Sequence, residues 1–185
     1  SQIDRNATLD VQMQAHAMLG LVFTKLNSAT NSVGEYNKVR GLYKDPTAAA
    51  KRILETGDER KLAKALTAVG EAMFFFAEQR RKEVDKIRFP EYKGAGTRED
   101  VTKHLNTKVA DWIKKKRPAI EDASNEYKKI VDMQPQPPPK WVIAAGSRVG
   151  QMWGKFVVEF RAAPSSVVCF CAPCMRILKI SWGSR

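Results

Sequence analysis

Apolar residues recur at steps of three and four along most of the chain, and this spacing constrains the fold more than any other feature. In the first predicted helix, residues 8–26, the apolar positions are Val11, Ala15, Met18, Val22 and Leu26. Such steps place side chains on one face of an α-helix. No segment shows the apolar–polar alternation of a half-buried strand for more than a few positions. The chain is therefore expected to be all-α.

Proline and glycine divide the first half of the chain into further helices. A second helix is expected to end before Asp45-Pro46, because the residue before a proline is pushed out of the helical region. An alanine-rich helix should follow over residues 47–56, with Gly57 as its stop. A long helix is then expected over residues 58–89, with apolar positions at Leu62, Leu66, Val69, Met73 and Phe76.

The sequence of the second half of the chain predicts three more helical segments. Thr97 should begin the first, and Pro118 is expected to interrupt it. The proline-rich stretch 134–139 reads as a stiff connector, and residues 140–162 form the last helix, closed by Pro164. Gly146, Gly150 and Gly154 line one face of that helix and are expected to let a neighbouring helix approach closely. An apolar stripe beside them is expected to be a core face, with an exposed peptide-docking groove as the alternative: Ala145, Val149, Met152, Trp153, Phe156, Val157 and Phe160.

The long helix contains two features that predict close packing. Phe74, Phe75 and Phe76 cannot all point the same way, since neighbours on a helix lie about 100° apart. At least one of them is therefore expected to meet another helix or a partner. Gly70 weakens helicity but allows another backbone to come close.

The composition is that of a globular protein with a basic excess. Hydrophobic residues make up 43% and charged residues 28% of 185 residues, which is ordinary for a folded domain. The 32 Lys and Arg against 20 Asp and Glu give a net charge of +12. This excess suits an acidic protein, a nucleic acid or an anionic membrane surface. No run approaches the roughly 18 apolar residues of a membrane span, so none is expected in the visible chain.

The two ends of the chain differ from its body. The chain begins at Ser1 without an initiator Met and without the pattern of a signal peptide. Because the initiator Met is missing, residues 1–164 are expected to be a helical fragment of a longer protein. Residues 165–185 hold all three cysteines, Cys169, Cys171 and Cys174. Thiolates at this spacing can bind zinc or an iron–sulfur cluster. No fourth ligand lies nearby, and an irregular, non-native tail is the preferred interpretation.

Two stretches share a spacing typical of a helical repeat. One contains Ala123, Tyr127, Ile130 and Pro135, followed by Trp141, and the other contains Leu19-Gly20, Phe23, Tyr36 and Val39. With these residues the chain resembles a tetratricopeptide-repeat (TPR) protein over most of residues 10–162. It departs from that pattern at several points: Ser32 replaces the usual alanine, Pro46 falls two residues late, residues 47–60 are inserted, and residues 58–89 read as one helix.

The resemblance implies a right-handed α-solenoid of degenerate antiparallel helix pairs. In such an array the first helix of each pair faces a concave surface. This implies partner-binding positions at Gln14, Ala17, Leu21 and Thr24 in the first unit and at Val142, Gly146 and Val149 in the last. The Lys and Asn of the family's carboxylate clamp are not matched at these positions, so no specific grip on a peptide C-terminus is expected. The implied function is a non-catalytic scaffold that binds a peptide or helix of another protein.

The last helix carries a second resemblance. It reads Lys140-Trp-Val-Ile-Ala-Ala-Gly-Ser-Arg-Val-Gly-Gln-Met-Trp-Gly-Lys155, followed by Glu159-Phe-Arg-Ala-Ala-Pro164. It is similar to segments of large repeat-bearing proteins of myxobacteria, which implies a bacterial protein of the cell envelope, periplasm or gliding-motility machinery; a cytoplasmic location stays open. In that family the chain continues past the proline with more helix, whereas here the cysteine-containing tail follows.

Two basic runs carry the competing hypothesis. Arg80-Arg81-Lys82 and Lys114-Lys115-Lys116-Arg117 are suited to neutralising phosphates, so a nucleic acid or an anionic surface is the alternative partner. The helices that carry these runs also carry acidic residues, and no nucleic-acid-reading module is present. A solvated helix face is therefore the preferred interpretation of these runs.

The sequence points to no catalytic site. Neither His16 nor His104 has a Cys or Ser nucleophile at a recognisable spacing. The chain also lacks a phosphate-binding glycine loop and a His-Glu-x-x-His motif. We therefore expect no enzyme activity, no cofactor and no metal.

Overall fold

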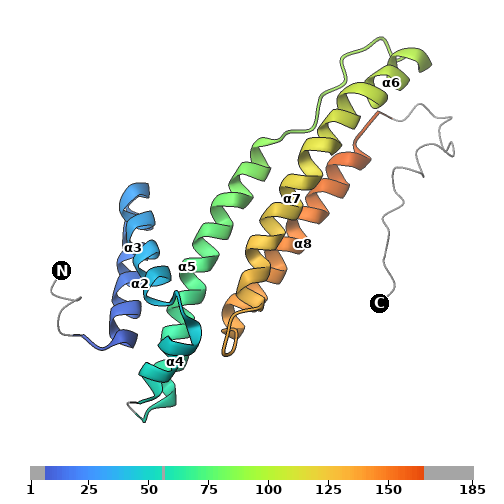
Figure 1. Ribbon diagram of the computed structural model, residues 1–185. Helices are drawn as coiled ribbons and strands as arrows, with labels where there is room; N and C mark the ends of the chain where they lie inside the picture. The colour runs from blue at the N-terminus through green and yellow to red at the C-terminus, as the bar shows by residue number, and fades with distance from the viewer. Residues whose placement is uncertain (1–6, 56, 165–185) are drawn as a thin grey trace, which may run out of the picture.

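The computed structural model describes residues 7–55 and 57–164, and this part of the chain contains helices and no strand. Its elements are α2 (Leu9–Lys25), α3 (Ala29–Leu42), α4 (Pro46–Leu54), α5 (Glu59–Lys86), α6 (Arg98–His104), a π-helical turn (Leu105–Val109), α7 (Ala110–Val131) and α8 (Pro139–Arg161) (Figure 1). The all-α prediction is confirmed for these residues. The predicted ends of the helices over residues 8–26, 47–56, 58–89 and 140–162, and the predicted C-terminal end of the second helix, agree with the structure to within about three residues.

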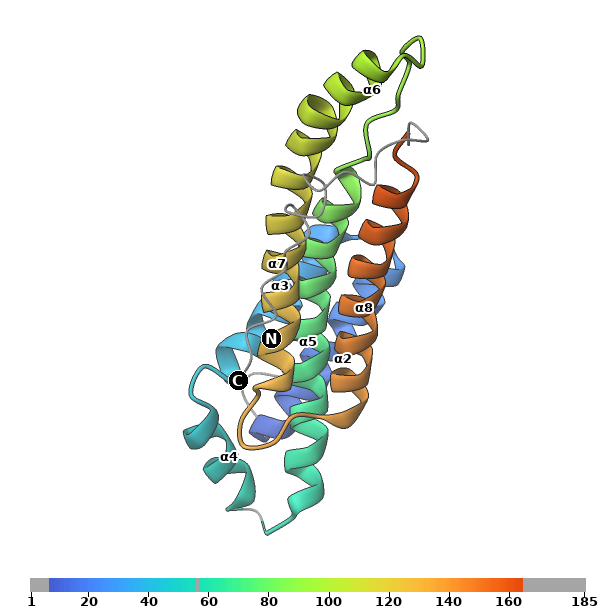
Figure 2. The same cartoon turned by 90° about the vertical axis from the view of Figure 1, so that its right-hand side faces the viewer.

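The long helix α5 lies between two helix pairs (Figures 1 and 2). The pair α2–α3 packs against its N-terminal half, and the pair α7–α8 packs against its C-terminal half. The short α4 folds back against α5 and the start of α2. The two pairs therefore pack on α5 rather than extensively on each other.

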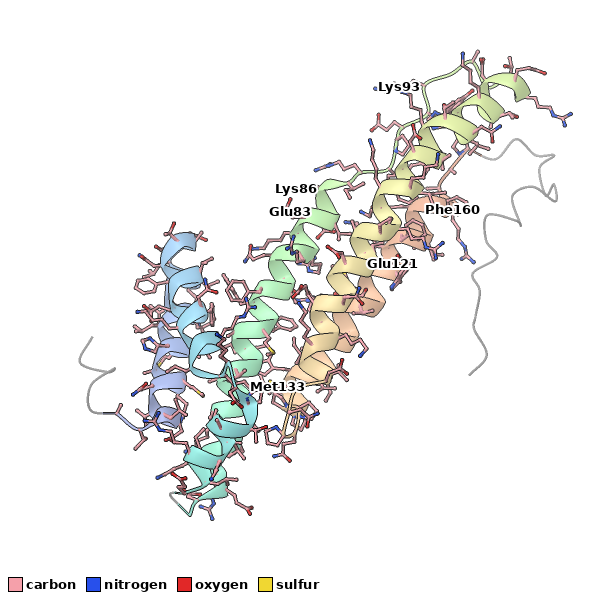
Figure 3. All side chains as sticks on the ribbon, viewed as in Figure 1. Glu83, Lys86, Lys93, Glu121, Met133 and Phe160 are labelled. Carbon is pink, nitrogen blue, oxygen red and sulfur yellow. The ribbon has the colours of Figure 1, made fainter. Side chains whose placement is uncertain are left out.

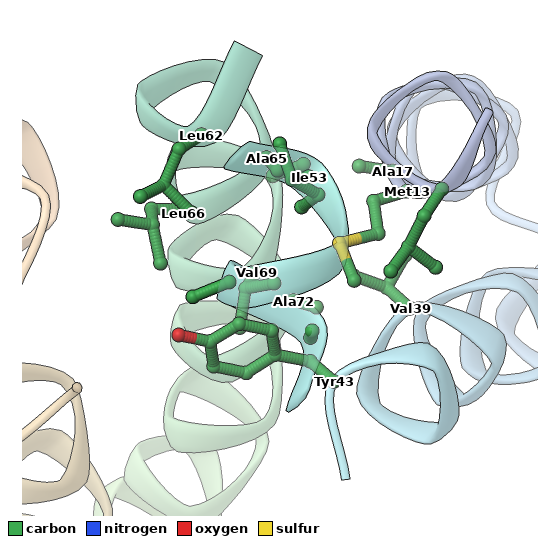
Figure 4. Close-up of a cluster of buried hydrophobic side chains, with 14 of the residues drawn as sticks. Met13, Ala17, Val39, Tyr43, Ile53, Leu62, Ala65, Leu66, Val69 and Ala72 are labelled. Atoms are coloured by element: carbon green, nitrogen blue, oxygen red, sulfur yellow. The ribbon is translucent and has the colours of Figure 1, made fainter. Parts of the chain in front are cut away.

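Two hydrophobic clusters follow from this arrangement. The first joins α2, α3, α4 and α5 around the buried side chains of Met13, Val39, Ile53, Leu66 and Val69 (Figure 4). The second joins α5, α7 and α8 around Ala77, Ile120, Tyr127, Ile130 and Met152. Met73 on α5 packs against both clusters. Met133, which follows α7, also belongs to the first cluster (Figure 3), so the loop before α8 ties the two halves together.

The consecutive phenylalanines of α5 serve opposite sides of the molecule. Phe75 lies against the Tyr36 ring of α3, with 4.5 Å between ring centroids. Phe74 lies 5.6 Å from the Tyr127 ring of α7 and 5.0 Å from the Trp141 ring of α8. The expectation that at least one of them meets another helix is confirmed, because neighbouring helix positions diverge by about 100°.

Two glycines allow aromatic rings to reach the neighbouring helix. A Cβ added at Gly20 would lie 2.8 Å from the Tyr36 ring, so the α2–α3 contact requires a residue without a side chain there. A Cβ added at Gly70 would lie 2.6 Å from the Trp141 ring and 2.7 Å from Pro138. The close approach expected at Gly70 is confirmed. At both places a small residue on one helix accepts a ring from another.

Pro118 does not interrupt its helix, and that prediction is wrong. The chain is helical from α6 through the π-turn and along all of α7, with Pro118 inside α7. Pro118 is exposed, and the helix passes through it because Trp112, Lys116 and Ile120 on the other side are buried. Tertiary packing of this face outweighs the local cost of the proline.

The apolar stripe that predicts α2 lies largely in solvent. Its larger members, Val11, Met18, Val22 and Leu26, are 45–68% exposed. The buried side chains of α2 are instead Leu9, Asp10, Met13, His16 and Ala17, together with Gly20. The spacing predicts the helix correctly but not the face that packs.

The glycine face of α8 also differs from its prediction. Nothing lies within 4 Å of a Cβ built at Gly146, Gly150 or Gly154, so no helix of the described chain approaches there. The core face of α8 is as predicted at Ala145 and Met152, which are buried, whereas Val157 is 46% exposed. α8 packs through the opposite side because that side carries Trp141, the partner of Gly70.

Candidate partner-binding groove

A groove of about 400 Å³ lies between α2 and α5. Its floor is formed by the buried Ala17 and Ala68, where small side chains let the two helices approach. Met18 and Leu21 on α2 remain 68% and 40% exposed along one wall. The complete lining is Gln14, Ala17, Met18, Leu21, Ala63, Lys64, Thr67, Ala68 and Glu71.

Three of the four partner-binding residues predicted in the first unit line this groove. They are Gln14, Ala17 and Leu21. The fourth, Thr24, is exposed one turn further on, and its hydroxyl donates to the Gly20 carbonyl at 2.8 Å. The sequence did not predict Met18 of α2 as a groove residue, nor the residues of α5. The spacing of three and four from Lys64 through Thr67 to Glu71 was the available signal for α5.

The residues predicted for the last unit do not join the groove. Gly146 is exposed, whereas Val142 and Val149 are half-buried on α8. Val149 packs against the second hydrophobic cluster. The structure therefore brings together the α2 residues with α5, and leaves the α8 residues on a separate surface.

Exposed apolar side chains concentrate beside the groove. Of the large apolar residues that are at least 36% exposed in the described chain, four lie on α2, and Leu26 is its C-cap: Val11, Met18, Leu21, Val22 and Leu26. Scattered surface apolar residues are normal, but a row of them along one helix beside a groove is typical of an interaction surface. This row extends the apolar surface beyond the two groove-lining residues Met18 and Leu21.

Glu71 is a half-buried carboxylate on the groove wall. The Tyr36 hydroxyl donates to its Oε1 at 3.1 Å. Burial raises the pKa of the Glu71 carboxyl, opposed by that hydrogen bond and by the charge of Lys140. No cation within the described residues makes an ion pair with it, because Lys140 lies over the Trp141 ring at 4.7 Å instead. Burial also raises the pKa of Tyr36, and the neighbouring Glu71 raises it further.

Two other carboxylates of α5 are fully engaged in holding α8. Glu78 accepts hydrogen bonds from Tyr127 at 2.5 Å and from Arg81 at 3.0 Å, and it pairs with Arg148 of α8 at 2.9 Å. Asp85 pairs with Lys155 of α8 at 2.9 Å and with Arg81 at 2.7 Å. Glu78 therefore connects α5, α7 and α8 at one point.

We expect these contacts to make the fold sensitive to acid. Burial alone would raise the pKa of the Glu78 carboxyl, but hydrogen bonds from Arg81 and Tyr127 and the charge of Arg148 hold it below its usual 4.5. A carboxyl with a lower pKa in the folded chain adds stability above its unfolded pKa, and this stability is lost as the pH falls through the folded pKa. The free energy of unfolding should therefore decrease as the pH drops below about 4.5.

Urea unfolding from about pH 7 to about pH 3 measures this decrease. Glu78→Gln should reduce the acid-dependent loss, whereas Glu83→Gln should leave it unchanged, since the partner of Glu83 among the described residues is Lys86, on the outer surface of α5 (Figure 3). Equal pH dependence in wild type and Glu78→Gln would contradict the role given to Glu78.

The basic runs are partly used inside the fold. Arg81 bridges Glu78 and Asp85. Lys116 is 1% exposed, and its Nζ donates to the Val84 and Ile87 carbonyls at 2.8 Å, where α5 ends. The interpretation of this run as a solvated face is wrong at Lys116. Burial lowers the pKa of Lys116, opposed by Glu159, while its ammonium satisfies carbonyls that a helix end leaves without partners.

The described residues contain no grouping suited to bind a metal ion, and none of their helices is long and apolar enough to cross a membrane. His16 is buried, with its Nδ1 2.5 Å from Glu35 Oε2. The cysteines at 169, 171 and 174, and the predicted irregular tail, lie outside the described residues.

No protein-family model, curated protein or solved structure matches the chain. The resemblance to TPR proteins therefore depends on the residues of the chain alone.

Proposed function

We propose that this chain is a non-catalytic scaffold that holds an extended or helical segment of another protein in the groove between α2 and α5. The observation that carries this proposal is the exposure of Met18 and Leu21 above the alanine floor of that groove. An apolar surface of this kind accepts the apolar side chains of an amphipathic segment. Burial of their surface there would contribute about 25 cal/mol of binding free energy per Å².

The TPR-like array is part of the same proposal. Tyr36 and Tyr127, the ring positions of the two proposed units, are 2% and 1% exposed. Contacts of α2 with α3 and α5, and of α5 with α7 and α8, are consistent with consecutive helix pairs stacked in one direction. The similarity of residues 140–164 to repeat proteins of myxobacteria carries the further proposal of a bacterial cell-envelope location.

A protein partner is favoured over nucleic acid because the central members of both basic runs are engaged within the fold. Arg81 and Lys116 are committed to Asp85, Glu78 and helix-end carbonyls. Salt separates the two partners. Phosphate binding would weaken steeply between about 50 and 200 mM salt, whereas apolar groove binding should change little.

To test this proposal, peptides that bind the full chain are selected from a random library by display. Leu21→Asp should weaken the selected peptides by about tenfold or more, because it places a charge in the apolar wall. Val33→Asp on α3 is the matched control: Val33 is 36% exposed against 40% for Leu21, and it does not line the groove. Affinity is measured by fluorescence anisotropy, and thermal unfolding verifies that both variants fold.

Selection of no peptide, or of peptides that bind both variants equally well, would contradict the proposal. If the chain instead binds DNA with a steep salt dependence, and no selected peptide loses affinity with Leu21→Asp, the result would support a nucleic acid as the partner.

A further inference from the structure

We infer that the groove selects a segment carrying a basic side chain beside its apolar anchor, and that this side chain pairs with the carboxylate of Glu71. The inference depends on the proposed function, because it names the chemistry of the segment that the groove binds.

Glu71 differs from the other inward carboxylates of α5. Glu71, Glu78 and Asp85 follow one another at intervals of seven residues, which places them on one side of the helix, two turns apart. Arg148 and Lys155 of α8 pair with Glu78 and Asp85. Burial raises the pKa of Glu71 and the charge of Lys140, at the start of α8, opposes this rise, but the ammonium lies over the Trp141 ring. Within residues 7–55 and 57–164, no side chain makes a direct ion pair with Glu71.

The local geometry keeps this carboxylate oriented. The Tyr36 hydroxyl donates to Oε1, and the Tyr36 ring is itself held between Gly20 and Phe75. A half-buried carboxylate with one neutral donor is less satisfied than one that meets a cation. An incoming ammonium or guanidinium would supply the direct ion pair that Lys140 does not make.

Lys64 gives the groove a direction. It lines the groove seven residues before Glu71, about 10 Å away along the axis of α5. The apolar floor of Ala17 and Ala68 lies along the groove with them. A bound segment therefore meets the cation of Lys64 at one end of the groove, the apolar floor in the middle and the carboxylate of Glu71 at the other end. Its basic side chain is expected at the Glu71 end.

The charge of the whole chain sharpens this selection. With a net charge of +12, the protein repels a segment that is basic along its length. One basic side chain at Glu71 gains an attractive partner, whereas further basic residues meet Lys64 and the surrounding cations. The preferred segment is therefore amphipathic, with a single basic residue next to its apolar anchor.

The test uses the peptides selected by display on the full chain that lose affinity with Leu21→Asp. Each is remade with its basic residue replaced by glutamine, and each pair is measured on wild type, Glu71→Gln and Glu83→Gln. Glu71→Gln keeps an oxygen for the Tyr36 hydroxyl and removes only the charge. Glu83 lies on the same helix, is exposed and does not line the groove, so Glu83→Gln is the matched control.

We expect Glu71→Gln to weaken the basic peptides by about tenfold and their glutamine versions by less than about twofold. Glu83→Gln should change neither. Leu21-dependent peptides that lack a basic residue, or that bind Glu71→Gln as well as wild type, overturn this inference while leaving the proposed function standing. Absence of any Leu21-dependent peptide overturns the proposed function itself.

Discussion

Replacement of Tyr127 by alanine is expected to lower the free energy of unfolding by about 3–5 kcal/mol, as for other buried aromatic residues. The ring is 1% exposed and lies 5.6 Å from Phe74 between α5 and α7. Its removal leaves a cavity in the second hydrophobic cluster and deprives Glu78 of a hydrogen-bond donor. Such a loss is a large part of the stability of a typical domain.

Tyr127→Phe separates the ring from the hydroxyl. It keeps the ring and removes only the hydrogen bond to Glu78, which retains Arg81 and Arg148 as partners. We expect a loss of about 1.5–3 kcal/mol, since the hydrogen bond is made to a charged group. Urea unfolding followed by circular dichroism measures both variants. A loss below about 1 kcal/mol for Tyr127→Ala would mean that the ring is not packed between α5 and α7.

Gly70→Val is expected to destabilise the chain by about 3 kcal/mol, at the upper end for overpacked cores. Any Cβ at this position would overlap the Trp141 ring and Pro138. The ring cannot move freely, because its Nε1 donates to the Thr67 carbonyl at 2.9 Å and its face lies 5.0 Å from Phe74. A larger residue must therefore separate the beginning of α8 from α5.

Gly34→Val on α3 is the matched control. Gly34 is helical, and nothing lies within 4 Å of a Cβ built there. Valine favours the helix over glycine by a few tenths of a kcal/mol, so this variant should be as stable as wild type or slightly more stable. Similar unfolding curves for Gly70→Val and Gly34→Val would show that α8 does not pack on Gly70.

The sequence predicts the helical elements well because helix formation leaves a local periodic pattern. The limits of the long helix α5 follow from Asp58 and the run of apolar residues after it, and the structure places Asp58 as its N-cap. The contact between Gly20 and Tyr36 could also be predicted. In the repeat pattern a small residue on one helix makes room for the aromatic ring of the paired helix.

The packing faces could not be predicted with the same success. The stripe from Val11 to Leu26 predicts a helix, yet most of it is exposed, since α2 packs through Met13, Ala17 and Gly20 instead. Pro118 and Lys116 show the same limit: their positions in the fold depend on contacts with distant residues such as Val84 and Ile87. Periodicity carries no information on these partners.

The sequence predicts only some of the residues that line the groove. Gln14, Ala17 and Leu21 follow from the repeat resemblance, whereas Lys64 and Glu71 required knowledge of how α5 lies beside α2. The significance of Glu71 depends on the lack, within the described residues, of the direct ion pair that Glu78 and Asp85 make with α8. Such a difference between equivalent positions is visible only in three dimensions.

The placement of α5 between the two helix pairs is tested most directly by distances between spin labels. Cys169, Cys171 and Cys174 would first be replaced by serine, and labels then attached in pairs at Met18 with Lys64 and at Met18 with Ile143. Met18 and Lys64 line the same groove, whereas Ile143 is 73% exposed on α8, beyond α5. Double electron–electron resonance should give a short distance for the first pair and one longer by about one interhelical spacing of 8–10 Å or more for the second. Equal distances for the two pairs would indicate a closed bundle in which α2 packs on α8, and would contradict the stacked arrangement.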